Sequence, residues 1–271
     1  MTTWRLELAW DGRRYLGWQR QPQGETVQQA VEEALARVLD APARVEATGR
    51  TDAGVHALQQ VAAFRTEAQR TPRGLVGGLN HHLPRDIACL DAAVAPDDFD
   101  PRRWTRGKLY RYRILVRWPR CPFREGLAWH LGQPLRVAEM ATAAAAFVGR
   151  HDFSSFQAQG CAAEHPVRTL AAARVTAHED EVWLEFEGHG FLRHQVRIMA
   201  GTLVEVGLGR QPVDMPALAL AARDRGRAGP TLPAQGLWLV RVDCPPTPRP
   251  PLETTLEPAL EPALETRPED T

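Results

Sequence analysis

The chain has 271 residues, enough to bury a substantial core as one large domain or two smaller ones. No run approaches the ~18 apolar residues that a membrane-spanning helix needs, and the N-terminus "MTTWRLELAWDG" lacks the basic and apolar segments of a signal peptide. The four cysteines are scattered without a CxxC pair, which favours reduced thiols in a cytoplasmic protein over a disulfide framework or a zinc site.

The formal net charge is zero, but the charge is distributed unevenly. From Pro245 onward two arginines stand against six acidic residues, so this segment carries −4 and residues 1–244 carry +4. Nearly every cation is arginine, with Lys108 as the only lysine. Arginine suits bidentate contacts with phosphate. A GC-rich genome that favours arginine codons is an equally good explanation of the bias.

The first half alternates strand and helix patterns. Residues 4–10 alternate apolar and polar side chains, which predicts a strand. Thr26 and Gln29 form a capping box that opens a helix to about residue 40. Short strands are predicted at 44–47 and 58–64. A helix opened by Thr71 and Pro72 follows, and then a strand over 86–94. The predicted order is β-α-β-β-α-β.

The second half repeats this order. Strands are predicted at 109–116 and 236–242, and a hairpin over 168–189 turns at His178–Asp180. Helices are predicted at 136–149 and 191–207, with a short one around 215–223. We therefore expect an α+β protein with two ferredoxin-like halves, residues 1–104 and 105–244, each an antiparallel sheet backed by helices. The acidic, Pro-rich segment 245–271 is predicted to be disordered.

The turn between the strands at 44–47 and 58–64 is unusual, because it carries an arginine and a carboxylate two residues apart. Arg50 and Asp52 can project to the same side, and Gly49 and Gly54 on either side permit close approach of a ligand. An Asp in such a turn usually serves the turn itself. Presented at a surface beside a guanidinium, it could instead be a nucleophile or general base. No second carboxylate or His–Cys set accompanies it at ligand spacing, which argues against a metal site.

The stretch "GRTDAGVHA" closely resembles the catalytic motif of the tRNA pseudouridine synthase A family. Further stretches resemble that family in the same order: "YLGWQRQP", "NHHLPRDI", "PDDFDPR", "YRYRI", "HDFSSF" and "GFLRHQVRIMAGTLVEVG". The resemblance covers roughly residues 4–243. It implies an isomerase that converts uridine to pseudouridine at positions 38, 39 and 40 in the anticodon arm of tRNA, without cofactor or metal. It also implies a cytoplasmic homodimer that builds its RNA cleft from both subunits.

The resemblance also implies roles for individual residues. Asp52 matches the nucleophilic aspartate, which attacks either C1′ of the sugar or C6 of the uracil. Arg50 matches the arginine that helps to expel the target base and occupies its place. Tyr110 matches the tyrosine that stacks on the flipped uracil, and its hydroxyl could take the C5 proton. Arg197 matches the basic residue that holds Asp52 ionised. Where the family commonly has Met, this chain has Gln195, an amide that needs a partner.

Two residues have ordinary structural explanations, and the whole chain has alternative functions. Arg50 could simply pair with phosphate or solvent, and Tyr112 is interpreted as packing within the sheet. For the whole chain, the main alternative is a non-catalytic RNA-binding protein with a ferredoxin-like platform. Such a protein would not need the Arg50–Asp52 pair, since a carboxylate repels phosphate. A glycosidase-like hydrolase normally needs two carboxylates, and the sequence offers no persuasive second one.

Overall fold

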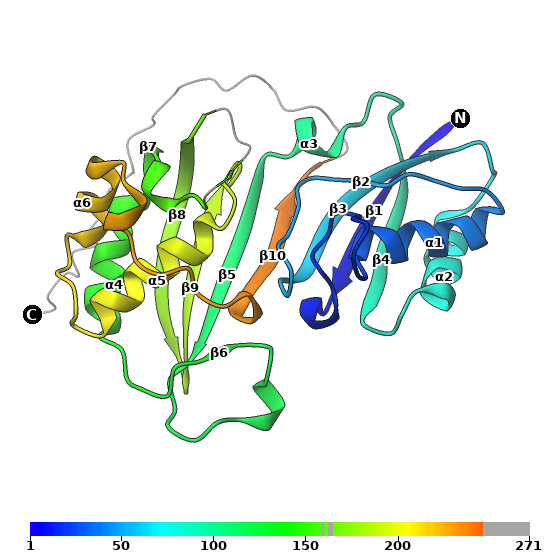
Figure 1. Ribbon diagram of the computed structural model, residues 1–271. Coiled ribbons are helices and arrows are strands. Elements are labelled where there is room, and N and C mark those ends of the chain that lie inside the picture. The colour runs from blue at the N-terminus through cyan, green and yellow to red at the C-terminus, as the bar shows by residue number, and fades with distance from the viewer. Residues whose placement is uncertain (159, 162–164, 246–271) are drawn as a thin grey trace, which may run out of the picture.

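The computed structural model describes residues 1–158, 160–161 and 165–245 (Figure 1). A mixed α+β architecture is confirmed: in these residues ten strands form one sheet, with main order β4-β1-β3-β10-β5-β9-β8-β7. Apart from Pro245, the predicted disordered tail lies outside the described residues. No helix in the described ranges is long and apolar enough to cross a membrane.

The first half follows the predicted element order. It consists of β1 (Thr2–Trp10), α1 (Val27–Leu39), β2 (Glu46–Ala47), β3 (His56–Thr66), α2 (Pro72–His82) and β4 (Ile87–Ala95). Thr26 caps α1 by accepting from the Gln29 amide, but the Gln29 side chain turns to Glu33 instead of returning to Thr26, so only half of the predicted capping box forms. Thr71 caps α2 as expected. β2 is shorter than predicted, because only Glu46 and Ala47 pair with β3.

The second half has the same plan. Its elements are β5 (Gly107–Leu115), α4 (Val137–Ala144), β8 (Val167–His178), β9 (Glu181–Gly188), α5 (Gln195–Gly207) and β10 (Leu237–Asp243). The predicted hairpin is confirmed, with Glu179 and Asp180 in its turn. Short elements that the sequence did not predict are α3 (Pro101–Trp104), β6 (Trp129–His130) and β7 (Gly149–Asp152), and α6 (Met215–Ala222) matches the expected short helix.

The two halves share one sheet instead of forming separate antiparallel sheets. β10 pairs antiparallel with β5 and also runs parallel to β3, with Trp238 opposite His56 and Leu239 opposite Ala57. This pairing gives hydrogen-bond partners to backbone N–H and C=O groups that would be exposed if β3 and β10 were open edges of two separate sheets. Because the halves have the same strand order and β3 runs parallel to β10, they carry their helices on the same face of the sheet. α1 and α2 cover one end, and α4, α5 and α6 cover the other (Figure 1).

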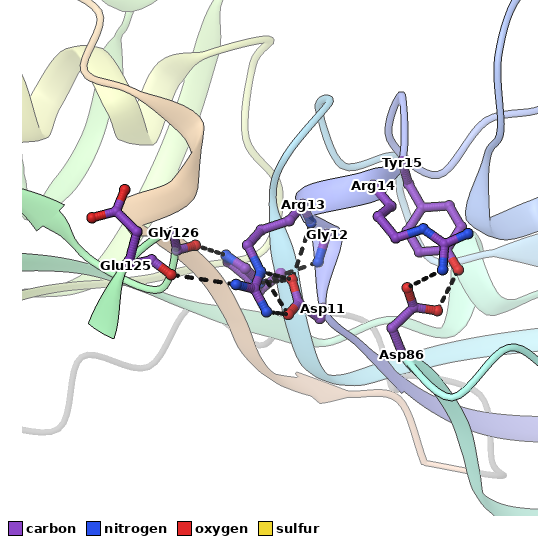
Figure 2. Close-up of polar contacts among 9 residues, drawn as sticks. Asp11, Gly12, Arg13, Arg14, Tyr15, Asp86, Glu125 and Gly126 are labelled. Atoms are coloured by element: carbon purple, nitrogen blue, oxygen red, sulfur yellow. Dashed lines mark hydrogen bonds and ion pairs between the residues drawn. The ribbon is translucent and has the colours of Figure 1, made fainter. Parts of the chain in front are cut away.

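A loop after β1 connects the halves on one side of this junction. Figure 2 shows Arg13 reaching from Asp11 to the backbone of Glu125, in the segment between β5 and β6. Asp86 holds the same loop from the other side, accepting from Arg14 and from the Tyr15 hydroxyl (Figure 2). The start of the loop is therefore fixed from two sides before the chain turns toward the cleft described below.

His56 follows Asp52 by four residues in the sequence, but its surroundings indicate a role in the fold. Its ring is completely buried and stacks on Trp238 with 4.2 Å between ring centroids. Its Nδ1 accepts from the Gly12 amide, and its Nε2 lies 3.0 Å from the Gly126 carbonyl. Burial lowers the pKa of His56 below its ordinary value of 6.5. A neutral ring with its proton on Nε2 satisfies both contacts, so His56 fastens the first half to the β5–β6 segment.

Candidate active site

The turn from Thr48 to Val55 links β2 to β3, as predicted, and it is held by neighbouring segments. The Trp18 amide donates to the Thr51 carbonyl, the Gly54 amide donates to the Tyr15 carbonyl, and the Trp10 indole donates to the Val55 carbonyl. Gly54 has φ of +78°, in the left-handed region that favours glycine. These contacts give the turn a fixed path around Asp52.

Asp52 lies opposite the beginning of α5. Its Oδ2 atom is 3.3 Å from Nη1 of Arg197, whose Nε also donates to the Leu232 carbonyl at 2.7 Å. Arg197 therefore has the partner that an arginine on an otherwise apolar helix requires. Oδ1 of Asp52 has no hydrogen bond or ion pair with the described residues. One carboxylate oxygen is held by a cation while the other is left for a ligand.

A second side chain, just before α5, approaches the same oxygen. Nε2 of His194 lies 3.5 Å from Oδ2 of Asp52. His194 is the residue before α5 and has φ of +61°, a strained conformation for a non-glycine residue. Burial lowers the pKa of His194 below 6.5, and Arg197, Arg193 and Arg225 lower it further against the opposing effect of Asp52. His194 is therefore neutral at pH 7 and can donate to or accept from a ligand beside Asp52.

Tyr110 and Tyr112 occupy the same face of β5 but have different surroundings. The Tyr112 side chain is fully buried, and its hydroxyl donates to the Pro233 carbonyl at 2.8 Å, which is the packing role expected from sequence. Tyr110 lines the cleft and packs edge-on against Phe191, and among the described residues its hydroxyl has no hydrogen-bond partner. Burial raises the pKa of Tyr110 above 10, and the charge of Asp52 raises it further. The hydroxyl is therefore protonated in the free protein.

Arg50 and Asp52 both line the cleft described below. Arg50 is exposed and has no hydrogen bond or ion pair within the described part of the chain. The guanidinium beside the carboxylate is therefore that of Arg197, which the sequence places 145 residues away.

These residues surround a cleft of about 1110 Å³ between the two groups of helices. The Thr48–Val55 turn forms one wall and the beginning of α5 forms the other, while Tyr110 and Leu237 come from β5 and β10 at the centre of the sheet. Arg50, Arg102, Arg193 and Arg197 give the lining a positive character. Gln195, by contrast, is buried, and its Oε1 accepts from the Leu192 amide, so the amide has the partner that the sequence analysis required. In the described ranges no group of three or more His, Cys, Asp or Glu could hold a metal ion.

Sequence reasoning missed His194. The signal that marks it is its left-handed backbone conformation, which arises because the chain must turn sharply before α5 and which no periodic pattern reveals. For the same reason the predicted helix over 191–207 starts only at Gln195.

If Asp52 is the nucleophile that the sequence resemblance implies, Arg197→Met should slow its reaction about 100-fold with little effect on the affinity for the expected RNA substrate. The substitution removes the guanidinium that fixes Oδ2, and a small misplacement of a reacting group costs a factor of this size. Arg193→Met is the matched control, because Arg193 is an exposed arginine of the same cleft without contact to Asp52. It should weaken RNA binding and leave the single-turnover rate unchanged. Equal losses of rate in the two variants would contradict the role of Arg197.

The chain is similar to known proteins over most of its length. A family model described as tRNA pseudouridine synthase matches residues 8–102 and 143–245. The chain is 48% identical over 250 residues to a tRNA pseudouridine synthase A of Myxococcus xanthus, covering 91% of this chain and 94% of that one. It is 46% identical over 246 residues to the tRNA pseudouridine synthase A of Rhodospirillum rubrum, covering 90% of this chain and 88% of that one. Asp52, Arg50, Arg197 and the start of α5 all lie within the matched residues.

Proposed function

The chain belongs to the tRNA pseudouridine synthase family and is an isomerase that forms pseudouridine in tRNA, and we propose that it acts at positions 38, 39 and 40 of the anticodon arm. We propose Asp52 as its nucleophile, working without a cofactor. The observation that carries this assignment is the Asp52 carboxylate in the cleft, with Oδ2 held by Arg197 and Oδ1 unengaged by described residues.

The reaction rearranges one nucleotide without any net gain or loss of atoms. Oδ1 of Asp52 attacks C1′ of the ribose or C6 of the uracil, and the N1–C1′ bond breaks. The uracil turns within the cleft, and C5 forms the new bond to C1′. The proton on C5 then passes to a base, for which we propose the Tyr110 oxygen, N1 gains a proton, and Asp52 is released as a carboxylate. Both routes need an ionised carboxylate next to a flipped nucleotide, which is the arrangement that Arg197 and the cleft support.

The remaining cleft residues have roles in binding. Tyr110 would stack on the flipped uracil, since its ring lies at the wall of the cleft and its hydroxyl is free of described partners. Arg50 is exposed beside Asp52 and pairs with none of the described residues, so it can enter the base stack that the uracil leaves. Arg102 and Arg193 can contact backbone phosphates at the rim.

A homodimer in the cytoplasm completes the proposal. Trp118 and Phe123, between β5 and β6, are 84% and 90% exposed. Large apolar side chains that are this exposed support an interaction surface on that segment. Analytical ultracentrifugation of the purified protein measures its subunit number directly.

The choice of tRNA positions is tested with unmodified transcripts. Each transcript carries a single uridine at position 38, 39 or 40, and a control transcript carries cytidine at all three. We expect pseudouridine only where the anticodon arm has a uridine. Modification of the control transcript elsewhere would reject the anticodon arm as the site.

A further inference from the structure

The backbone just before Arg50 accepts hydrogen bonds from side chains of three other elements. The carbonyls of Ala47, Thr48 and Gly49 each accept a hydrogen bond, from Arg102 Nε at 3.4 Å, Lys108 Nζ at 2.8 Å and Gln60 Nε2 at 3.1 Å respectively. Strand pairing does not extend to Thr48 and Gly49, because β2 ends at Ala47. The backbone that leads to Asp52 is therefore fixed by donors from α3, β5 and β3.

Lys108 is the central donor of this set. A Cβ atom on Gly49 would lie 2.6 Å from its Nζ, so the glycine leaves room for the ammonium. The sequence analysis attributed Gly49 to the approach of a ligand; Gly49 lines the cleft, and its lack of a side chain also leaves room for Lys108. In a chain with no other lysine, this compact ammonium lies against the turn that carries Asp52. Tyr110 follows two residues later on the same strand.

Resting on the proposed function, we propose that Lys108 is a positioning residue that holds the backbone of the Thr48–Val55 turn and thereby places Asp52 for attack. It does not touch the substrate in this proposal, and it acts through the Thr48 carbonyl. Its loss should therefore slow the chemical step and loosen the turn, while RNA affinity is preserved.

The first test measures the turn itself and does not depend on activity. The amides of Thr48, Gly54 and Val55 are hydrogen-bonded to the carbonyls of Val61, Tyr15 and Asp52, so their hydrogen exchange reports opening of the turn. In Lys108→Met these amides should exchange about tenfold faster, while amides of β1 and β9 remain as in the wild type. Arg111→Met is the control, since Arg111 is on the same strand and pairs with Glu185 instead of the turn. It should leave the three amides unchanged.

The second test separates rate from binding. In single turnovers on a tRNA transcript, Lys108→Met should lose about 10–100-fold in rate with less than a twofold change in dissociation constant. Lys108→Arg retains a cationic donor and should recover part of the loss.

The third test follows pH. The pKa of Lys108 is lowered to about 8, mainly by burial and also by the charge of Arg102, while Cys244 has a raising effect. The ammonium is therefore present at pH 7 and is lost as pH rises through 8. The charge-assisted bond to Thr48 weakens with it, so the wild-type rate should decline above pH 8 while the rate of Lys108→Met stays flat there.

Gly49→Ala gives an independent variant that keeps the lysine but displaces its ammonium. It should reproduce the faster exchange and the slower rate. The double variant Gly49→Ala/Lys108→Met should show the same exchange and the same rate as Lys108→Met alone.

Wild-type exchange at the three amides of Lys108→Met together with a wild-type rate would overturn the proposal. Equally faster exchange throughout β3 and β5 would also overturn it, because Lys108 would then support the fold in general. If the wild type formed no pseudouridine, the proposed function would fail while the exchange test still decided the role of Lys108.

Discussion

Asp52→Asn should reduce pseudouridine formation by at least about 10⁴-fold while tRNA still binds. The amide has nearly the same shape as the carboxylate, but it carries no anion with which to attack C1′ or C6. Arg197 would lose its ionic partner and keep its bond to the Leu232 carbonyl, so α5 should stay in place. Product formation on a transcript is measured beside a binding assay at fixed salt concentration.

Asp91→Asn serves as the control for this change, because Asp91 is an exposed carboxylate on β4. It should be as active as the wild type. Appreciable turnover by pure Asp52→Asn would remove Asp52 from the role of nucleophile. Loss of tRNA binding in that variant would show that the carboxylate supports the structure of the cleft instead.

Tyr110→Phe should lose about 10²–10⁴-fold in rate with little change in affinity, provided that the hydroxyl takes the C5 proton. The hydroxyl lacks a described partner and its pKa is raised partly by the charge of Asp52. That contribution disappears while Asp52 is bonded to the substrate, so the phenol becomes easier to ionise at the stage when a base is needed. Release of tritium from C5 of uridine in single turnovers measures the step.

Tyr112→Phe is the matched control on the same face of β5. It removes the bond to the Pro233 carbonyl, which should lower the free energy of unfolding by about 1 kcal/mol and leave tritium release unchanged. If Tyr110→Phe released tritium at the wild-type rate, Tyr110 would only stack on the base, since a phenyl ring stacks equally well.

Much of the fold was predictable because the elements have clear periods and caps. Thr26 and Thr71 cap α1 and α2, and the alternation in β9 marks its buried face. The joining of the halves into one sheet was not predictable, since the parallel pairing of β10 with β3 depends on residues about 180 positions apart. The start of α5 was misplaced for a local reason, the left-handed conformation of His194.

The site was predictable where a motif carried it. The resemblance identified Asp52, Arg50, Tyr110 and Arg197, and the structure brings all of them to one cleft. The role of the donors behind the turn was not predictable, although Arg102 is the last residue of the motif "PDDFDPR". Arg102 and Lys108 reach the carbonyls of Ala47 and Thr48 from α3 and β5, and no spacing in the sequence reveals a side chain that contacts distant backbone.

The most direct test of the central claim is a chemical map of pseudouridine in an unmodified tRNA transcript after incubation with the purified protein, with no cofactor added. The protein should convert uridines of the anticodon arm to pseudouridine and release no free uracil. Free uracil would indicate a hydrolase. Retention of the transcript without any change in its uridines would indicate an RNA-binding protein and would contradict the account.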